Sequence, residues 1–293
     1  MRQTHPVLPF LSVAVGIAVF CVMDALMKRA SIATGVYAAV LARNCCGTLL
    51  MALPWWQSGG QKPGWQVLKV HLTRSAAVAG MAPLYFWGLV RIPMAEAIAL
   101  SFIAPLIALY LAAVLLGEKI RPQAIVASLL GFGGVMVIAA ARLQSGHFDA
   151  DSLWGIASIL ASAVLYAWNL ILQRQQAQVA SPQEIALFQN LFVAMFLLTV
   201  APWLGRWPET NAWPDIVAAA ATAGLALMLL SWGYARAEAQ ALVPIEYSAF
   251  IWSALMGWLW FDEAVSGATL AGVVLIVAAC WIAAGGRTEQ TAL

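Results

Sequence analysis

Long apolar stretches, each followed by a short polar segment, run through the whole sequence. Each stretch holds about 20 residues, the length that an α-helix needs to cross the hydrocarbon core of a bilayer. The expected spans are 8–28, 35–56, 70–90, 94–117, 122–142, 153–174, 184–204, 214–235, 242–261 and 266–285. The pattern therefore predicts an all-α integral membrane protein with ten transmembrane helices. The first span lacks a small-residue cleavage site, so we expect a retained helix and not a signal peptide.

One part of the sequence occurs twice. Residues 84–134 correspond to residues 229–279 at a constant offset of 145, without a gap. The offset aligns these pairs: Trp87 with Trp232, Gly88 with Gly233, Arg91 with Arg236, Glu118 with Glu263 and, further back, Asp24 with Asn169. We therefore expect two five-helix repeats, 1–146 and 147–293, in one membrane unit. Because each repeat has an odd number of spans, the second enters the membrane from the opposite face, so the repeats are inverted.

The composition of the chain limits the kinds of molecule that it is expected to bind. Of its 293 residues, 63% are hydrophobic and 10% are charged, whereas soluble domains have about 25% charged residues. The net charge of +2 gives no reason to expect a nucleic-acid partner. The four cysteines form no C-x-x-C pair, and His5, His71 and His147 are expected in loops or at an end. We therefore expect no metal and no cofactor.

Basic residues in the loops predict the orientation, because such loops face the cytoplasm. One side would hold Arg2, Lys62, Lys69, Arg74, Lys119, Arg121, Arg174, Arg236 and Arg287. The other would hold Lys28, Arg29, Arg91, Arg142 and Arg206. Nine residues against five predict that both termini are cytoplasmic.

The ends of the fourth and ninth spans resemble the drug/metabolite transporter superfamily, in particular its EamA-type carriers of ten helices. The first repeat supplies Pro105 followed by LIALYLAAVLLGE, and the second supplies PIEYSAFIWSALMGWLWFDE from Pro244 to Glu263. The resemblance covers nearly the whole chain and implies a carrier in the bacterial inner membrane. Within the superfamily, the chain is most similar to the YddG-type exporters of aromatic and other neutral amino acids. Phe250 stands where the repeat has Pro105, so a kink in the fourth span need not recur in the ninth.

Arg43, followed by Asn44, is the most informative polar position, because it falls near the middle of the second span. An arginine at the bilayer centre costs about 2.5–3.5 kcal/mol on insertion scales, so something must offset that cost. A guanidinium facing a central cavity could bind the carboxylate of a solute with two parallel hydrogen bonds. Alternatively, the span starts later, and Arg43 lies at the outer interface or pairs with Asp24.

Two spans combine small or polar residues with a proline. In the fourth span, Ser101 is a cavity candidate because the nearby Pro105 frees a backbone carbonyl. In the ninth span, Glu246, Tyr247 and Trp252 are candidates for solute contact. Glu246 could couple transport to protons, or it could be a first-turn acid that binds free N–H groups of its helix.

The other candidate solute contacts are Tyr85, Trp87, Trp168, Asn169 and Gln189, which are polar or amphipathic residues in apolar spans. Such groups usually face the bundle interior, where a hydrogen bond between helices is the alternative role of each. Together they predict a polar and aromatic cavity for a neutral solute. Glu118 and Glu263 end equivalent spans, and we expect each to accept bonds from N–H groups of the following helix.

These features predict a carrier that exports small metabolites, above all neutral or aromatic amino acids, by alternating access around a midplane cavity. Its partners would be the solute, the lipid bilayer and, as a candidate coupling ion, the proton. The alternatives are an exporter or importer of another solute, such as a drug, a nucleoside or a sugar derivative, a channel, and an intramembrane enzyme. The sequence has no filter loop and no H-E-x-x-H or G-x-S-x-G motif, which argues against the last two.

Overall fold

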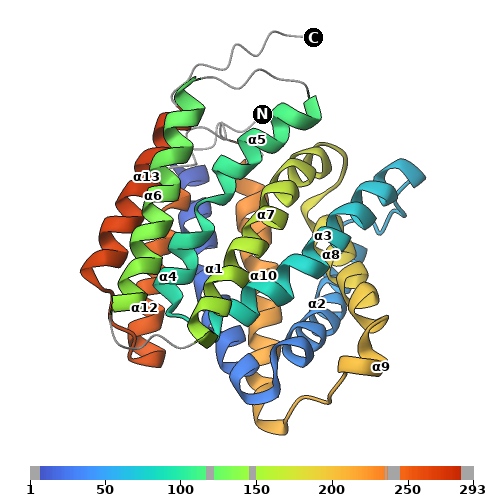
Figure 1. Ribbon diagram of the computed structural model, residues 1–293. Helices are drawn as coiled ribbons and strands as arrows, with labels where there is room; N and C mark the ends of the chain where they lie inside the picture. Colours follow the sequence, from blue (N-terminus) through green and yellow to red (C-terminus); the bar gives the residue numbers. More distant parts are fainter. Residues whose placement is uncertain (1–6, 117–121, 145–149, 235, 237–244, 285–293) are drawn as a thin grey trace.

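The computed structural model describes residues 7–116, 122–144, 150–234, 236 and 245–284, which form helices joined by turns. The helices, labelled as in Figure 1, are α1 (Leu8–Thr34), α2 (Val36–Gln57), α3 (Trp65–Leu89), α4 (Met94–Ser101), α5 (Ala104–Leu116), α6 (Pro122–Gln144), α7 (Ala150–Val179), α8 (Pro182–Leu198), α9 (Ala201–Leu204), η1 (Thr210–Ala212), α10 (Trp213–Tyr234), α12 (Ala249–Phe261) and α13 (Gly267–Ala284). Each expected span overlaps at least one of these helices; the fourth overlaps both α4 and α5, and the seventh overlaps both α8 and α9. The prediction of an all-helical membrane protein is confirmed.

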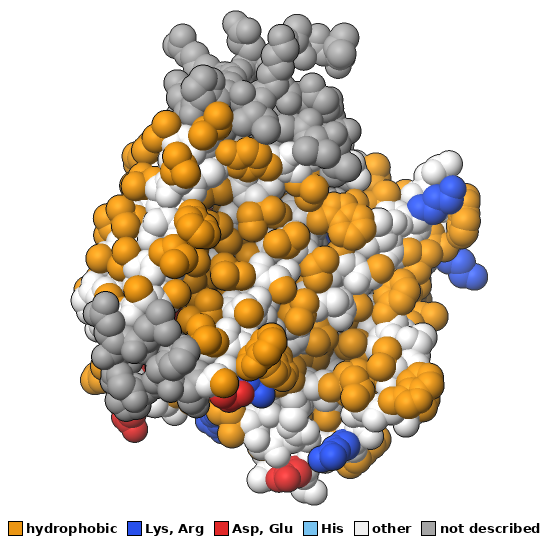
Figure 2. Space-filling model, viewed as in Figure 1, with side chains coloured by type: hydrophobic (Ala, Val, Ile, Leu, Met, Phe, Trp, Pro, Cys, Tyr) orange, Lys and Arg blue, Asp and Glu red, His pale blue; other side chains and the backbone are white. Residues whose placement is uncertain are grey.

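The surface and the helix lengths agree with a membrane location. Within the described residues, four helical segments are long and apolar enough to cross a membrane by length and composition: Leu8–Thr34, Val36–Gln57, Ala150–Gln173 and Thr210–Gly233. Shorter apolar helices accompany them. Figure 2 shows hydrophobic side chains over most of the visible face, whereas charged side chains lie at its lower and right margins. Such an apolar belt with charged margins fits a protein surrounded by lipid.

The helix pairs follow the pseudo-two-fold symmetry that inverted repeats require. At the offset of 145 residues, α1 corresponds to α7 and α3 corresponds to α10. In the structure α1 packs along α10, and α3 packs along α7, so the two contacts are equivalent. The remaining principal pairs, α2 with α8 and α6 with α13, each join a helix to its own repeat equivalent; α6 and α13 lie side by side at the left of Figure 1. The two repeats therefore form one interleaved bundle.

The duplicated Trp-Gly motif has the same local structure in both repeats. The guanidinium carbon of Arg91 lies 3.5 Å from the ring centre of Trp87, and that of Arg236 lies 4.3 Å from the ring centre of Trp232. Each arginine also donates a hydrogen bond to the carbonyl of the same tryptophan, at 2.8 and 3.1 Å. These cation–π contacts hold the arginines at helix ends.

Both repeats also contain a broken helix. A turn at Phe102 and Ile103 separates α4 from α5, and a turn at Tyr247 and Ser248 precedes α12, at the equivalent position. The Phe102 and Tyr247 rings meet edge to face, with centroids 5.2 Å apart. The break therefore recurs in the second repeat although Phe250 stands in place of proline. Packing across the pseudo-two-fold axis accompanies the break in both repeats, whereas proline accompanies it in only one.

Three charged or titratable residues that we expected in loops lie inside the bundle. Lys28, His71 and Arg74 are 4%, 0% and 3% exposed and belong to α1 and α3. The error arises because each lies near an expected span end, where the apolar pattern does not fix the boundary. Arg74 was counted among the basic residues on the cytoplasmic side and Lys28 among those on the other side. Leaving both out of the count therefore keeps the excess of basic residues on the cytoplasmic side.

The helices α6 and α13 pack closely at Gly134. A Cβ atom added to Gly134 would lie 2.6 Å from the carbonyl oxygen of Gly272, whereas one added to Gly133 would meet no atom within 4 Å. We expect Gly134→Ala to separate the helices and to cost about 1–3 kcal/mol, as overpacking does. Gly133→Ala should be neutral or stabilising, because alanine favours the helix. Thermal unfolding in detergent measures both, and a Gly134→Ala protein as stable as wild type would contradict the close contact.

Candidate functional site

Three polar side chains meet inside the bundle. Asp24 lies on α1, Arg43 on α2 and Tyr85 on α3. The Tyr85 hydroxyl donates a 3.1 Å hydrogen bond to Oδ2 of Asp24. Asp24 and Arg43 are close enough to interact electrostatically. We call these three residues the central cluster. Arg43 and Tyr85 were predicted as site residues, whereas Asp24 was expected only as an alternative partner of Arg43.

Arg43 lies within α2 and not at its end, because the helix begins at Val36. It is 9% exposed, so its side chain lies among the helices and not on the outer surface of the bundle. Within the described residues, Arg43 and Asp24 do not form a direct ion pair. Nη2 of Arg43 donates a long hydrogen bond of 3.3 Å to Asn44, and Nε is buried without a partner among the described residues. The guanidinium therefore retains unused hydrogen-bonding capacity.

Two predicted amides occupy equivalent positions in the repeats, Asn44 on α2 and Gln189 on α8. Asn44 is 1% exposed, and its Nδ2 donates to the carbonyl of Val40 at 2.7 Å. Oε1 of Gln189 is buried and has no partner within the described part of the chain. The second amide thus adds another unfilled acceptor on the helix that packs along α2.

The broken helices hold three more predicted residues. Ser101 and Glu246 are repeat equivalents, and each directly precedes the residue at which its helix turns. The Ser101 hydroxyl donates to the carbonyl of Ala97 at 2.8 Å. Tyr247 lies at the second turn, opposite Phe102. Broken helices of this kind line solute sites in carriers built from inverted repeats.

Tyr166 on α7 links the central cluster to the second broken helix. It lies within electrostatic range of both Asp24 and Glu246, and it packs beside Ala104 and Ala163. Sequence reasoning missed Tyr166. The signal was available, because Tyr166 is an amphipathic residue within an apolar span, as Tyr85 is.

The remaining predicted residues lie in other surroundings. Trp87 packs under Arg91 at the end of α3. Asn169 is buried on α7 and accepts a hydrogen bond from Arg74, described below. Trp168 and Trp252 are 36% and 37% exposed. The structure therefore brings together Arg43, Asn44 and Tyr85, and it places the two tryptophans on more open faces of their helices.

Buried polar contacts join the two repeats at the end of the bundle where α1 ends, which we call the Lys28 end. Lys28 forms an ion pair with Glu263 and donates a 3.0 Å hydrogen bond to the carbonyl of Ile92. Oε2 of Glu263 accepts from the N–H group of Met94 at 2.7 Å, at the start of α4. The expectation that Glu263 binds the following helix is wrong, because its carboxylate reaches α1 and α4 of the first repeat. Glu118, its equivalent, lies outside the described residues.

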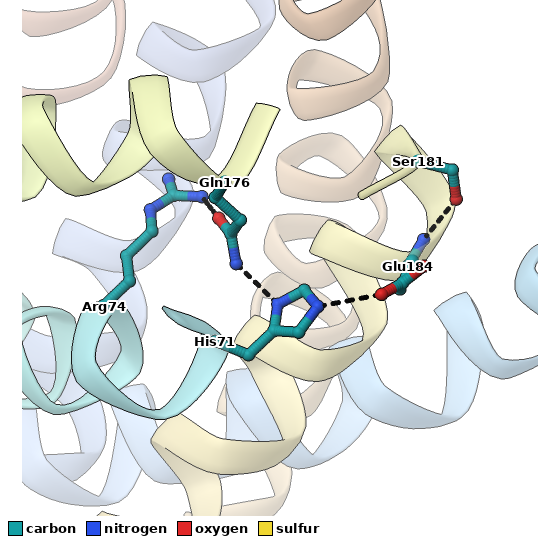
Figure 3. A network of polar contacts seen from close by, with 5 residues as sticks. All are labelled: His71, Arg74, Gln176, Ser181 and Glu184. Carbon is teal, nitrogen blue, oxygen red and sulfur yellow. Dashed lines mark hydrogen bonds and ion pairs between the residues drawn. The ribbon is translucent and has the colours of Figure 1, made fainter. Parts of the chain in front are cut away.

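A second polar network joins α3, α7 and α8 near the opposite end, which we call the His71 end (Figure 3). Nε2 of His71 lies 3.0 Å from Oε1 of Glu184, and Nδ1 lies 2.6 Å from Nε2 of Gln176. Gln176 accepts a hydrogen bond from Arg74 through Oε1. Arg74 also donates to Asn169 at 2.9 Å and to Gln173 at 3.4 Å. The groups of this network satisfy one another.

Local sequence explains how this network forms. The Ser181 hydroxyl accepts a 3.3 Å hydrogen bond from the N–H group of Glu184 and so caps α8. The Glu184 side chain points instead toward His71 (Figure 3). The His71 ring stacks on Phe188, with centroids 5.2 Å apart. On α7, the three amides that bind Arg74 are Asn169, Gln173 and Gln176. Their helical spacing places them on one face. That spacing was the signal for this network in the sequence.

The central cluster lies apart from the surface grooves. One groove of about 520 Å³ is lined by Tyr247 and apolar residues of α12 and α13, and another of about 510 Å³ lies between α1 and α10. Neither is lined by a residue of the central cluster. Within the described residues, no three His, Cys, Asp or Glu side chains are grouped to hold a metal ion. The chemistry that the cluster offers is therefore recognition of charge and of hydrogen-bonding groups.

The chain is similar over most of its length to known transporters. It is 29% identical to the pseudopaline exporter CntI of Pseudomonas aeruginosa, over 89% of this chain and 90% of the relative. It is 26% identical to a riboflavin transporter of Vibrio cholerae, over 93% and 91%. It is also 28% identical to the aromatic amino acid exporter YddG of Ancylobacter novellus, over 68% and 70%. These relatives are transporters and not enzymes.

A solved crystal structure supports the fold independently. It is 23% identical to this chain, covers 97% of it and 99% of its own length, and superimposes with a TM-score of 0.66. The model of the EamA-like transporter family matches residues 8–140 and again residues 153–285, once in each repeat. The chain therefore belongs to the EamA-like transporter family, as a multi-pass membrane protein that transports small molecules.

Proposed function

We propose that this chain is a bacterial inner-membrane carrier that exports neutral or aromatic amino acids by alternating access. The repeats, 1–146 and 147–293, would move relative to each other around the central cluster. The name of one relative, an aromatic amino acid exporter, supports this solute class. Other relatives carry the names of different solutes, so the solute class rests on the chemistry of the site.

The observation that carries the proposal is the unfilled guanidinium of Arg43. A buried donor without a partner costs about 1–3 kcal/mol, and the interior of a bilayer offers no water to satisfy it. A solute carboxylate would accept two parallel hydrogen bonds, one from Nε and one from a terminal nitrogen of Arg43. We therefore assign Arg43 to the carboxylate of the solute, with Asn44 holding the guanidinium in place.

The polar contacts at the two ends support alternating access. The Lys28–Glu263 pair and the His71 network each join the first repeat to the second, on opposite sides of the central cluster. Opening either end requires breaking contacts between repeats, so each end can act as a gate.

Orientation rests on the basic bias and on the ends of the bundle. The start of α1 and the end of α13 both lie toward the top of Figure 1. We assign that side to the cytoplasm, which places the His71 end inside and the Lys28 end outside. A proton gradient is the candidate coupling force, and transport with and without a pH gradient tests it.

Arg43→Lys tests the carboxylate assignment. Lysine keeps the charge but loses the planar fork, so we expect the initial rate of L-phenylalanine transport into proteoliposomes to fall roughly 10-fold or more. Wild-type protein should prefer L-phenylalanine to L-phenylalaninamide, which lacks the carboxylate. Arg29→Lys is the matched control, because that side chain is 51% exposed and forms a surface pair with Asp215. Equal transport of acid and amide by wild type would refute the assignment.

The Lys28–Glu263 pair generates a prediction about the gate. Glu263→Gln would remove the charge that offsets a buried ammonium, and we expect a loss of about 3 kcal/mol in stability. Adding Lys28→Met should recover stability, because apolar replacement of a buried pair is often neutral. Transport by the double variant should stay low, because the closing contact is gone.

Thermal unfolding and L-phenylalanine transport measure the two effects separately. Asp151→Asn is the control, since Asp151 is 60% exposed and pairs with Arg91 at the surface. A stable double variant that transports at the wild-type rate would show that the pair does not act as a gate.

A further inference from the structure

Asp24 is an acidic and Arg43 a basic side chain, yet no direct contact joins them. They are 8% and 9% exposed and interact electrostatically, but no ion pair joins them in the described part of the chain. Elsewhere the same chain pairs buried charges closely, as Lys28 and Glu263 show. Separated opposite charges in a low-dielectric interior are costly unless another group lies between them.

Asp24 also has unused hydrogen-bonding capacity. An ionised carboxylate offers about four acceptor sites. Among the described residues, Asp24 accepts one hydrogen bond, from Tyr85 to Oδ2, and Oδ1 has no partner. The Tyr85 bond fixes the orientation of the carboxylate and leaves Oδ1 free to accept. Arg43 complements it with the partnerless donor Nε.

We propose that Asp24 binds the ammonium group of the solute while Arg43 binds its carboxylate, so that the central cluster selects zwitterions. This inference rests on the proposed function and names the residue that recognises the ammonium group, so that the solute needs both a free ammonium and a free carboxylate on its α-carbon. A zwitterion adds no net charge to the buried site and satisfies both charged side chains. A solute with only one of the two groups leaves the other side chain unpaired.

The satisfied networks at the ends of the bundle separate this role from a structural one. In the His71 network, Arg74 has three amide partners from α7. Arg43 has one, its neighbour Asn44. The Arg74 guanidinium therefore has partners at Nε and at both terminal nitrogens, whereas Nε of Arg43 has none among the described residues. The difference points to a partner that comes from outside the chain.

The test compares L-phenylalanine with 3-phenylpropanoate, which has the same ring and carboxylate but no ammonium group. Initial transport rates are measured in proteoliposomes that contain the full-length protein. We expect wild type to transport L-phenylalanine at least 10-fold faster than 3-phenylpropanoate, because a site built for a polar group rejects an analogue that lacks it. Asp24→Asn should reduce L-phenylalanine transport at least 10-fold and leave 3-phenylpropanoate transport unchanged or faster. Asp24→Glu, which keeps the charge, should retain the preference at a lower rate and serves if Asp24→Asn does not fold.

Asp151→Asn is the matched control, because it makes the same chemical change at a 60% exposed surface position. It should leave both rates at their wild-type values. An Asp24→Asn protein that keeps the wild-type preference would overturn the inference, even if it loses dependence on a pH gradient. Transport of both solutes at equal rates by wild type would also overturn it while leaving the carboxylate assignment intact. If wild type transports neither solute, the proposed function itself fails and this inference fails with it.

Discussion

A charged group inside a bilayer must find its partners within the protein, because the hydrocarbon core contains no water to replace them. This constraint divides the buried polar groups of the chain into two kinds. Toward the ends of the bundle, the Lys28–Glu263 pair and the His71 network provide partners from the opposite repeat. Between them, Asp24 and Arg43 retain free hydrogen-bonding atoms. The first kind joins the two repeats, and we propose that the second kind binds the solute.

The scaffold is nearly symmetric, whereas the charge is not. Equivalent positions form the Trp–Arg contacts and the facing turns at Phe102 and Tyr247. At the offset that relates the two repeats, Asn169 is the equivalent of Asp24, and Phe188 is the equivalent of Arg43. Symmetric helices allow the bundle to rearrange in equivalent ways at its two ends. Charges from one repeat alone give the site a defined direction, so a bound solute would have one preferred orientation.

Much of the fold could be predicted from the sequence, because apolar length and a constant offset are properties of the chain itself. The partners of individual side chains could not, since they depend on which helices pack together. His71 and Lys28 lie close to span ends, where a long polar side chain can face either a loop or the bundle. The turn at Tyr247 lacks a proline, and its position became visible only through its contact with Phe102. Arg43 was identified because a charge inside an apolar span is rare. The role that we propose for Asp24 came only from the structure, in which it accepts one hydrogen bond and lies near the partnerless Nε of Arg43.

A crystal structure of the carrier with 5-bromo-L-tryptophan tests the central claim most directly. The anomalous signal of bromine locates the aromatic side chain, and the electron density locates the ammonium and carboxylate groups. We expect one molecule between Asp24 and Arg43, with its carboxylate at Nε of Arg43 and its ammonium at Asp24. A solute bound elsewhere, with Arg43 closed directly onto Asp24, would contradict it.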